Sequence, residues 1–272
     1  MIKFRLIIFL LLIVTNITQA QNNTKINQSG KTIKTRINTP EGFYRITHPN
    51  NSFENYLQNL ALKPHGSKVY FYNGIIKPNH WVYQAVVDIE IGNRNLQQCA
   101  DAIMRLRAEY LYSQKKYDQI KFNFTNGFCC EYLKWMQGHR IIVERDNVCW
   151  KKKATIANTY PSFRKYMNIV FAYAGTLSLE KELKPVNIKD LKTGDVFIQG
   201  GSPGHAVIVV DVAKNSKNQK IFLLAQSYMP AQDIHILKNL KNKELSPWFS
   251  ANHIEKLVTP EWTFNKTDLR RF

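Results

Sequence analysis

The chain has 272 residues, enough for one large domain or two small ones with a buried core. Hydrophobic residues make up 44% and aromatic residues 12%, which excludes a disordered or fibrous protein, and four cysteines are too few for a scaffold built on disulfides. The net charge of +18 favours acidic partners, but the basic residues are spread along the chain without a nucleic-acid motif, so no nucleic-acid partner is predicted.

The N-terminus has the pattern of a secretory signal. Lys3 and Arg5 precede the apolar run 6–14, and Thr18 and Ala20 place small residues where a signal peptidase reads. Because the run is shorter than the ~20 residues of a membrane span, we expect a signal peptide over 1–20 and no stable span after its cleavage. This predicts an exported protein, periplasmic or extracellular. An uncleaved N-terminal anchor is the alternative.

The rest of the chain predicts one elaborated domain. The polar residues 21–40 predict a flexible leader, and the lack of repeats or linkers beyond them predicts a single α+β domain over 41–272. Helical spacing of apolar residues predicts helices over 53–62, 96–112 and 162–173. β-forming runs predict strands over 68–72 and 84–91, then an antiparallel meander of 195–199, 206–212, 221–225 and 234–237. The large middle insertion 117–153 is ambiguous, with strands over 120–124 and 140–143 and a short helix over 128–136.

Cys99 lies in the first turns of the helix predicted over 96–112. A thiolate there faces the positive end of the helix dipole and unpaired N–H groups, which lower its pKa and stabilise an oxyanion. Cys99 is therefore a candidate nucleophile. The alternative is a small core residue, because free cysteines are commonly buried.

His205 follows the glycine-rich segment 200–204 and opens the most apolar predicted strand. From the mouth of a strand it can face a helix end, take the proton of a thiol and return it to a leaving amine. The alternative is a histidine that is solvated or satisfied at a strand end.

A third polar group is expected to orient the imidazole, and Gln226, Ser227 and Asp211 are the choices. Asp211 ends the strand that His205 begins, about 20 Å away at ~3.3 Å per residue. Gln226 and Ser227 end the next strand, which returns antiparallel to the start of the first. This geometry favours Gln226, whose amide oxygen can accept from an imidazole. The alternative is that Gln226 caps its strand.

Three motifs in this order resemble the NlpC/P60 and CHAP branches of the papain-like cysteine hydrolases. They are Gln98-Cys99-Ala100-Asp101, Leu191-Lys192-Thr193-Gly194-Asp195-Val196-Phe197 and Gly204-His205-Ala206-Val207-Ile208-Val209-Val210. The resemblance implies a papain-like core in which the helix carrying Cys99 packs on an antiparallel sheet, with an N-terminal elaboration and a large middle insertion. It also implies cleavage of peptide or amide bonds, with cell-wall peptides of the cell envelope as one such substrate class. By the same resemblance, Cys99 is the nucleophile, His205 the base and Gln226 the orienting residue.

A second likeness extends over nearly the whole chain after residue 20. It rests on Gln97-Gln98-Cys99-Ala100-Asp101-Ala102, Leu106-Arg107-Ala108-Glu109-Tyr110-Leu111, Ala225-Gln226-Ser227-Tyr228-Met229-Pro230-Ala231-Gln232 and Thr259-Pro260-Glu261-Trp262. These segments are similar to an uncharacterised domain-of-unknown-function family of exported Bacteroidetes proteins. That likeness implies export and no activity.

Two other interpretations stay open. The middle of the chain offers four possible metal ligands, Cys129, Cys130, His139 and Cys149, but they lack the spacing of a zinc-binding motif, so no metal or other cofactor is predicted. If the protein is exported, the three cysteines could equally form one disulfide. The main rival function is a catalytically inactive papain-like domain that binds glycan or peptide. Tyr70, Tyr72, Trp81 and Tyr83 would then make a stacking surface, although core packing explains them equally well.

Overall fold

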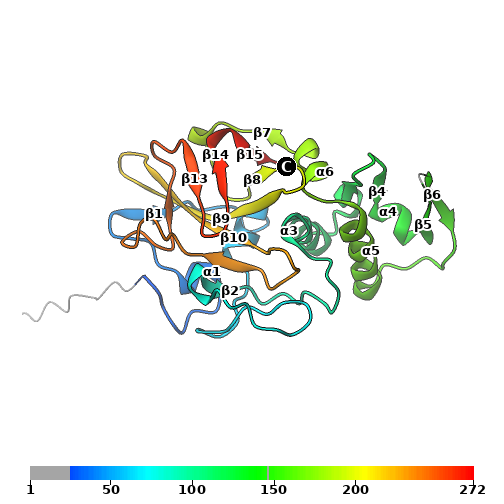
Figure 1. Ribbon diagram of the computed structural model, residues 1–272, viewed down its shortest axis with the longest axis horizontal. Coiled ribbons are helices and arrows are strands. Elements are labelled where there is room, and N and C mark those ends of the chain that lie inside the picture. The colour runs from blue at the N-terminus through cyan, green and yellow to red at the C-terminus, as the bar shows by residue number, and fades with distance from the viewer. Residues whose placement is uncertain (1–24, 146) are drawn as a thin grey trace, which may run out of the picture.

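A computed structural model describes residues 25–145 and 147–272, so the predicted signal peptide lies outside the described residues. Its centre is a sheet of nine strands in which every pairing is antiparallel (Figure 1). The strands run in the order β2-β11-β10-β9-β8-β15-β7, with β1 added beside β9 and β12 beside β10. Their bounds are β1 Phe43–Arg45, β2 Tyr83–Val86, β7 Lys184–Pro185, β8 Val196–Gln199, β9 His205–Asn215, β10 Lys220–Gln226, β11 His235–Leu237, β12 Phe249–Ser250 and β15 Leu269–Arg271.

Both faces of this sheet are buried, which is why β9 and β10 read as continuous apolar runs. Ala206, Ile208 and Val210 belong to the core cluster shared with the helices. Val207 and Val209, on the opposite face, belong to a second cluster. The first face is covered by α1 (Ile33–Arg36), α2 (Phe53–Gln58) and α3 (Cys99–Ser113), and the hairpin of β13 (Lys256–Val258) and β14 (Thr263–Asn265) contributes to the second cluster.

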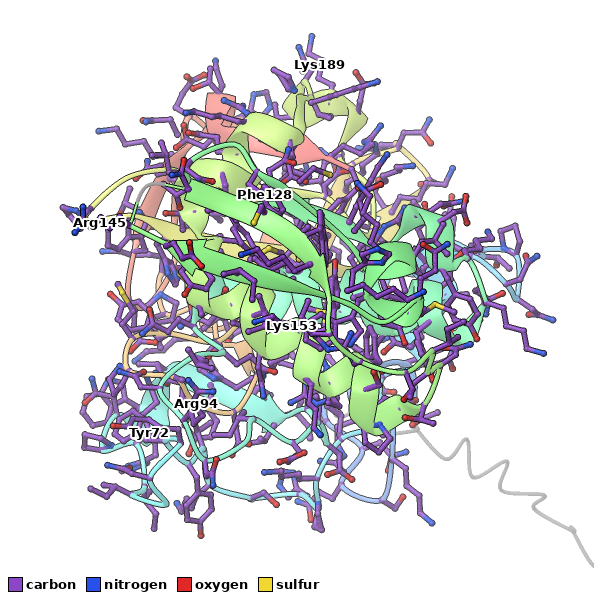
Figure 2. The ribbon with its side chains drawn as sticks, turned by 90° about the vertical axis from the view of Figure 1, so that its right-hand side faces the viewer. Tyr72, Arg94, Phe128, Arg145, Lys153 and Lys189 are labelled. Atoms are coloured by element: carbon purple, nitrogen blue, oxygen red, sulfur yellow. The ribbon has the colours of Figure 1, made fainter. Side chains whose placement is uncertain are left out.

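The middle insertion forms a separate lobe at one side of the sheet (Figure 1), and Figure 2 views the molecule from that side, with Phe128 and Lys153 labelled. Its elements are β3 Lys121–Asn123, β4 Cys129–Glu131, α4 Tyr132–Met136, β5 His139–Glu144 and β6 Asn147–Lys152, followed by α5 Tyr160–Tyr173 and α6 Thr176–Glu182. β3 pairs with β4 and β5 with β6, both antiparallel. Short 3-10 turns occupy η1 His80–Val82, η2 Tyr117–Gln119, η3 Ile188–Asp190 and η4 Lys266–Asp268.

The α+β class and the antiparallel meander β8-β9-β10-β11 are confirmed, and so is the packing of the Cys99 helix on that meander. The strand predicted over 68–72 is wrong. This segment makes only isolated bridges, Tyr70 with Ile76 and Phe71 with Gln232. It forms a loop because its bridge partners, Ile76 and Gln232, lie in two different loops and not in a strand.

The flexible leader predicted over 21–40 is corrected for residues 25–40, which pack against the domain. Ile33 and Ile37 are fully buried in the core shared with α2 and α3, and Ile26 forms a bridge with Ile37. The Trp248 indole N–H donates to the carbonyl of Asn38 at 2.9 Å. A segment with few apolar residues is therefore ordered, because these few side chains all enter one core.

Candidate active site at the start of helix α3

Helix α3 begins at Cys99 itself. Gln98 before it is extended, and its backbone N–H donates to the Asp101 carboxylate at 3.0 Å, so the acid at the third helical position closes the first turn. The backbone N–H groups of Cys99, Ala100 and Ala206 are near enough to the Cys99 sulfur to lower the pKa of the thiol. Since Ala206 follows His205 in β9, the helix start and the strand start meet at the thiol.

His205 is the first residue of β9 and is fully buried. Its Nε2 lies 2.9 Å from the Gln226 Oε1, and the rings of Tyr228, Trp262 and Phe264 surround it at centroid distances of 4.8, 5.4 and 5.9 Å. An amide oxygen can only accept, so Nε2 carries the ring proton and Nδ1 keeps a lone pair. The Nδ1 atom is buried without a hydrogen-bond partner among the described residues.

Gly204 is required immediately before this histidine. A Cβ at that position would lie 2.5 Å from the Thr176 hydroxyl and 2.6 Å from the Gly201 carbonyl oxygen. The glycine-rich turn predicted from sequence therefore lets the backbone of the loop pass against the start of α6.

Of the three candidates for the third position, the structure places Gln226 on His205. The Ser227 hydroxyl instead lies 3.0 Å from the Gln97 carbonyl oxygen and 2.8 Å from the Gln232 carbonyl oxygen, so its single proton is shared between the segment before α3 and the loop after β10. Asp211 is paired with Arg45 at 2.6 Å and with the Gln58 amide at 2.7 Å.

A cavity of about 730 Å³ opens at the thiol. Its wall is formed by the first turn of α3, the end of α5, the start of α6, the loop 201–204 and Met229. Cys99 and Asp101 both line it, although only 4% of the Cys99 surface is exposed. A small electrophile or an extended peptide segment has room beside the sulfur.

Burial raises the pKa of the Cys99 thiol to about 11, with the Asp101 carboxyl adding to the rise and the three backbone N–H groups opposing it. The expectation that the helix start gives a low thiol pKa is therefore wrong for the free protein, because desolvation outweighs the helix N-terminus. Burial likewise lowers the pKa of His205 to about 4, with Gln226 opposing the change and Lys77 adding to it. At neutral pH the site holds a neutral thiol and a neutral imidazole.

Asp101 modulates that thiol. Its side chain is buried, burial raises its pKa well above the ordinary value, and its Oδ1 has no hydrogen-bond partner among the described residues. Because Asp101 raises the pKa of Cys99, we expect Asp101→Asn to lower it. The alkylation rate of Cys99 by iodoacetamide, followed from neutral to alkaline pH, measures the change. A midpoint that stays in place or rises would contradict this role.

The depressed pKa of His205 also affects stability. An unfolded histidine takes up a proton near pH ~6.5, whereas folded His205 does so at about pH 4. Between these values the unfolded chain binds more protons, so this residue lowers the free energy of unfolding as pH falls through that window. We expect His205→Gln to flatten the dependence there by at most about 1.4 kcal/mol per pH unit, measured by urea unfolding. An unchanged slope would contradict the assignment.

Other residues singled out by the sequence lie elsewhere. Asp195 of the Gly194-Asp195 pair is fully buried in an ion pair with Arg271. The four cysteines are thiols, and no group of three or more potential ligands could hold a metal in the part of the chain that the structure describes. Tyr70 and Trp81 are exposed, whereas Tyr83 is buried.

Sequence reasoning missed the residues behind Gln226. Glu261 belongs to the segment Thr259-Pro260-Glu261-Trp262 that resembles the uncharacterised family, and this is the one sequence feature that points to it. Nothing in the sequence around Lys77 indicates a functional role. Glu261 accepts a hydrogen bond from Gln226 directly, and Lys77 reaches the site by donating to Glu261.

Comparison with known proteins matches the chain to a family model. The family model described as "Domain of unknown function (4846)" covers residues 33–271. No curated protein and no solved structure matches the chain significantly. Across the described residues, no helix combines the length and the apolar character needed to cross a membrane.

Proposed function

Because the chain belongs to the family described as "Domain of unknown function (4846)", which names no activity, we propose from its own geometry that it is an exported cysteine hydrolase. Its substrates would be peptide or amide bonds, with bacterial cell-wall peptides as the favoured class. One observation carries the proposal. His205 donates from Nε2 to Gln226 and keeps a buried Nδ1 that has no hydrogen-bond partner among the described residues, while the backbone N–H of Ala206, the next residue in β9, is near enough to the Cys99 sulfur to lower the pKa of the thiol.

In the proposed reaction the His205 Nδ1 takes the thiol proton as the Cys99 sulfur attacks the carbonyl carbon of the scissile bond. The carbonyl oxygen becomes an oxyanion, which the Cys99 backbone N–H at the start of α3 stabilises. The imidazolium then returns its proton to the leaving amine, and the C–N bond breaks to leave a thioester. A water molecule, deprotonated by His205, hydrolyses the thioester and restores the thiol.

A neutral Cys99 thiol and a neutral His205 imidazole suit this mechanism. The proton moves from sulfur to nitrogen during the attack, so the site does not have to keep a buried ion pair before substrate arrives. The imidazole is already unprotonated at neutral pH, because burial lowers the pKa of His205 to about 4.

The second candidate is an inactive papain-like domain that binds peptide or glycan. The near-complete burial of Cys99 and its raised pKa favour it, and the exposed rings of Tyr70 and Trp81 offer a stacking surface. Under this alternative Cys99 is a packing residue at the start of α3, and its thiol is not activated as a nucleophile.

Iodoacetamide alkylation of each cysteine, resolved by peptide mass spectrometry, distinguishes the hydrolase from the inactive binding domain. If His205 acts as base, Cys99 labelling levels off between about pH 5 and pH 8, where the imidazole is neutral. In His205→Ala the same labelling rises about tenfold per pH unit, as for an unassisted thiol. The exposed Cys129 serves as the internal control. An unassisted slope for Cys99 in both proteins would refute the hydrolase and favour the binding domain.

A further inference from the structure

A second layer of polar side chains lies behind Gln226. Its Nε2 donates to the Glu261 Oε2 at 2.7 Å, and the other oxygen of Glu261 is 2.6 Å from the Lys77 Nζ. Lys77 also donates to the Gln232 Oε1 at 3.0 Å. The side chains of Lys77 and Glu261 are 5% and 12% exposed, so this is a mostly desolvated ion pair. It joins the loop before β2, the loop after β10 and the β13–β14 hairpin at one point.

His235 supplies a second acceptor for the same amide. Its Nδ1 lies 2.8 Å from the carbonyl oxygen of Asp233, which can only accept, so Nδ1 carries the proton. Its Nε2 therefore keeps a lone pair, and the Gln226 Nε2 lies 3.4 Å from it. Burial lowers the pKa of His235 to about 3, so this ring stays neutral at ordinary pH.

These two acceptors determine which way the Gln226 amide points. If the amide were flipped, its oxygen would face a carboxylate and an imidazole lone pair, and its NH₂ would face His205. In the orientation present, the oxygen faces His205 and requires the proton on Nε2. The tautomer of His205 thus follows from groups that do not touch it.

We infer that Glu261, held by Lys77, is a positioning residue that sets the His205 tautomer through the Gln226 amide. The inference rests on the proposed function for its catalytic meaning, since a base at Nδ1 is useful only if Cys99 is the nucleophile. Lys77 stabilises the negative charge of Glu261 and keeps that side chain an acceptor. The other titratable groups around the pair are His205, His235 and Tyr228, whose ring centroid lies 5.5 Å from the Lys77 Nζ.

The test combines two variants with two measurements. Glu261→Gln is isosteric and lets residue 261 donate as well as accept, so the Gln226 amide can flip. The double variant Lys77→Met/Glu261→Leu removes both charges without leaving either one unpaired. Long-range proton–nitrogen NMR of the histidine rings reads the tautomer directly, and alkylation of Cys99 at neutral pH reads its consequence. Glu255→Gln, in an exposed pair with Lys266 beside the same hairpin, is the matched control.

The wild type and Glu255→Gln should show His205 protonated at Nε2 alone. Both test variants should add the Nδ1–H form and slow Cys99 alkylation about 10–100-fold, in the range of second-layer effects. A wild-type ring protonated at Nδ1, or an unchanged tautomer and rate in both folded variants, would overturn the inference. The NMR measurement of the His205 tautomer does not depend on Cys99, so it tests the positioning role alone. If the proposed hydrolase function is wrong, Cys99 alkylation will be unaffected by His205→Ala, whatever the tautomer.

Discussion

Cys99→Ala is expected to abolish the hydrolysis of peptides by this protein, with a fall in kcat of about 10³–10⁶-fold, the range seen when a nucleophile is removed from a preassembled site. The sulfur is the only atom at the start of α3 that can form the proposed thioester, and a methyl group in its place keeps the packing but cannot attack. Turnover is measured on a mixed library of peptides and cell-wall peptides, with products identified by mass spectrometry.

Cys129→Ser is the control for this experiment, because it removes an exposed thiol from the insertion and leaves the site intact. It should retain wild-type turnover. Gln226→Ala should retain the nucleophile and lose only part of the rate, since it removes the partner of His205 rather than a reacting group. Cleavage that persists in Cys99→Ala at the wild-type rate would refute the assignment of Cys99 as nucleophile.

Arg271→Met should destabilise the fold by about 3–5 kcal/mol at neutral pH, as expected for a buried charge that loses its partner. The guanidinium of Arg271 binds Asp195 through Nε at 2.6 Å and Nη2 at 2.9 Å, and the Lys192 backbone N–H donates to the same carboxylate at 2.9 Å. The Asp195 side chain has no exposed surface, so the substitution leaves a desolvated carboxylate without its cation, although Arg271 itself is 30% exposed. The midpoint of urea unfolding gives the change.

The effect should shrink in acid. Burial already raises the pKa of Asp195, while Arg271 opposes that rise, so the substitution raises this pKa further. Below the raised value the folded variant binds a proton that the unfolded chain does not yet hold, and stability recovers as pH falls. Asp195→Leu/Arg271→Met, which buries no lone charge, should lose less than the single variant. A loss that is equal at neutral and acid pH would argue against an unpaired carboxylate as its cause.

Secondary structure around the site follows from local pattern. The short apolar, β-forming runs of β8 to β11 and the helical spacing after Cys99 are visible in sequence because they are properties of neighbouring residues. The same reasoning located Gln226, since an antiparallel return must bring the end of one strand beside the start of the previous one. It failed for residues 25–40, where a few isoleucines outweigh a polar composition.

Local sequence pattern was sufficient to predict the α+β class, the meander and a helix with Cys99 in its first turns, and it favoured Gln226 over Ser227 and Asp211 as the partner of His205. Tertiary packing set the protonation states, because desolvation depends on what packs over a group. Burial raises the pKa of Cys99, where its place at a helix start predicts a lowered one. Tertiary packing likewise decided that Asp195 serves Arg271 and that Lys77 and Glu261 stand behind Gln226. The residues in each of these contacts are far apart in the chain, so the spacing of neighbouring residues cannot predict that they meet.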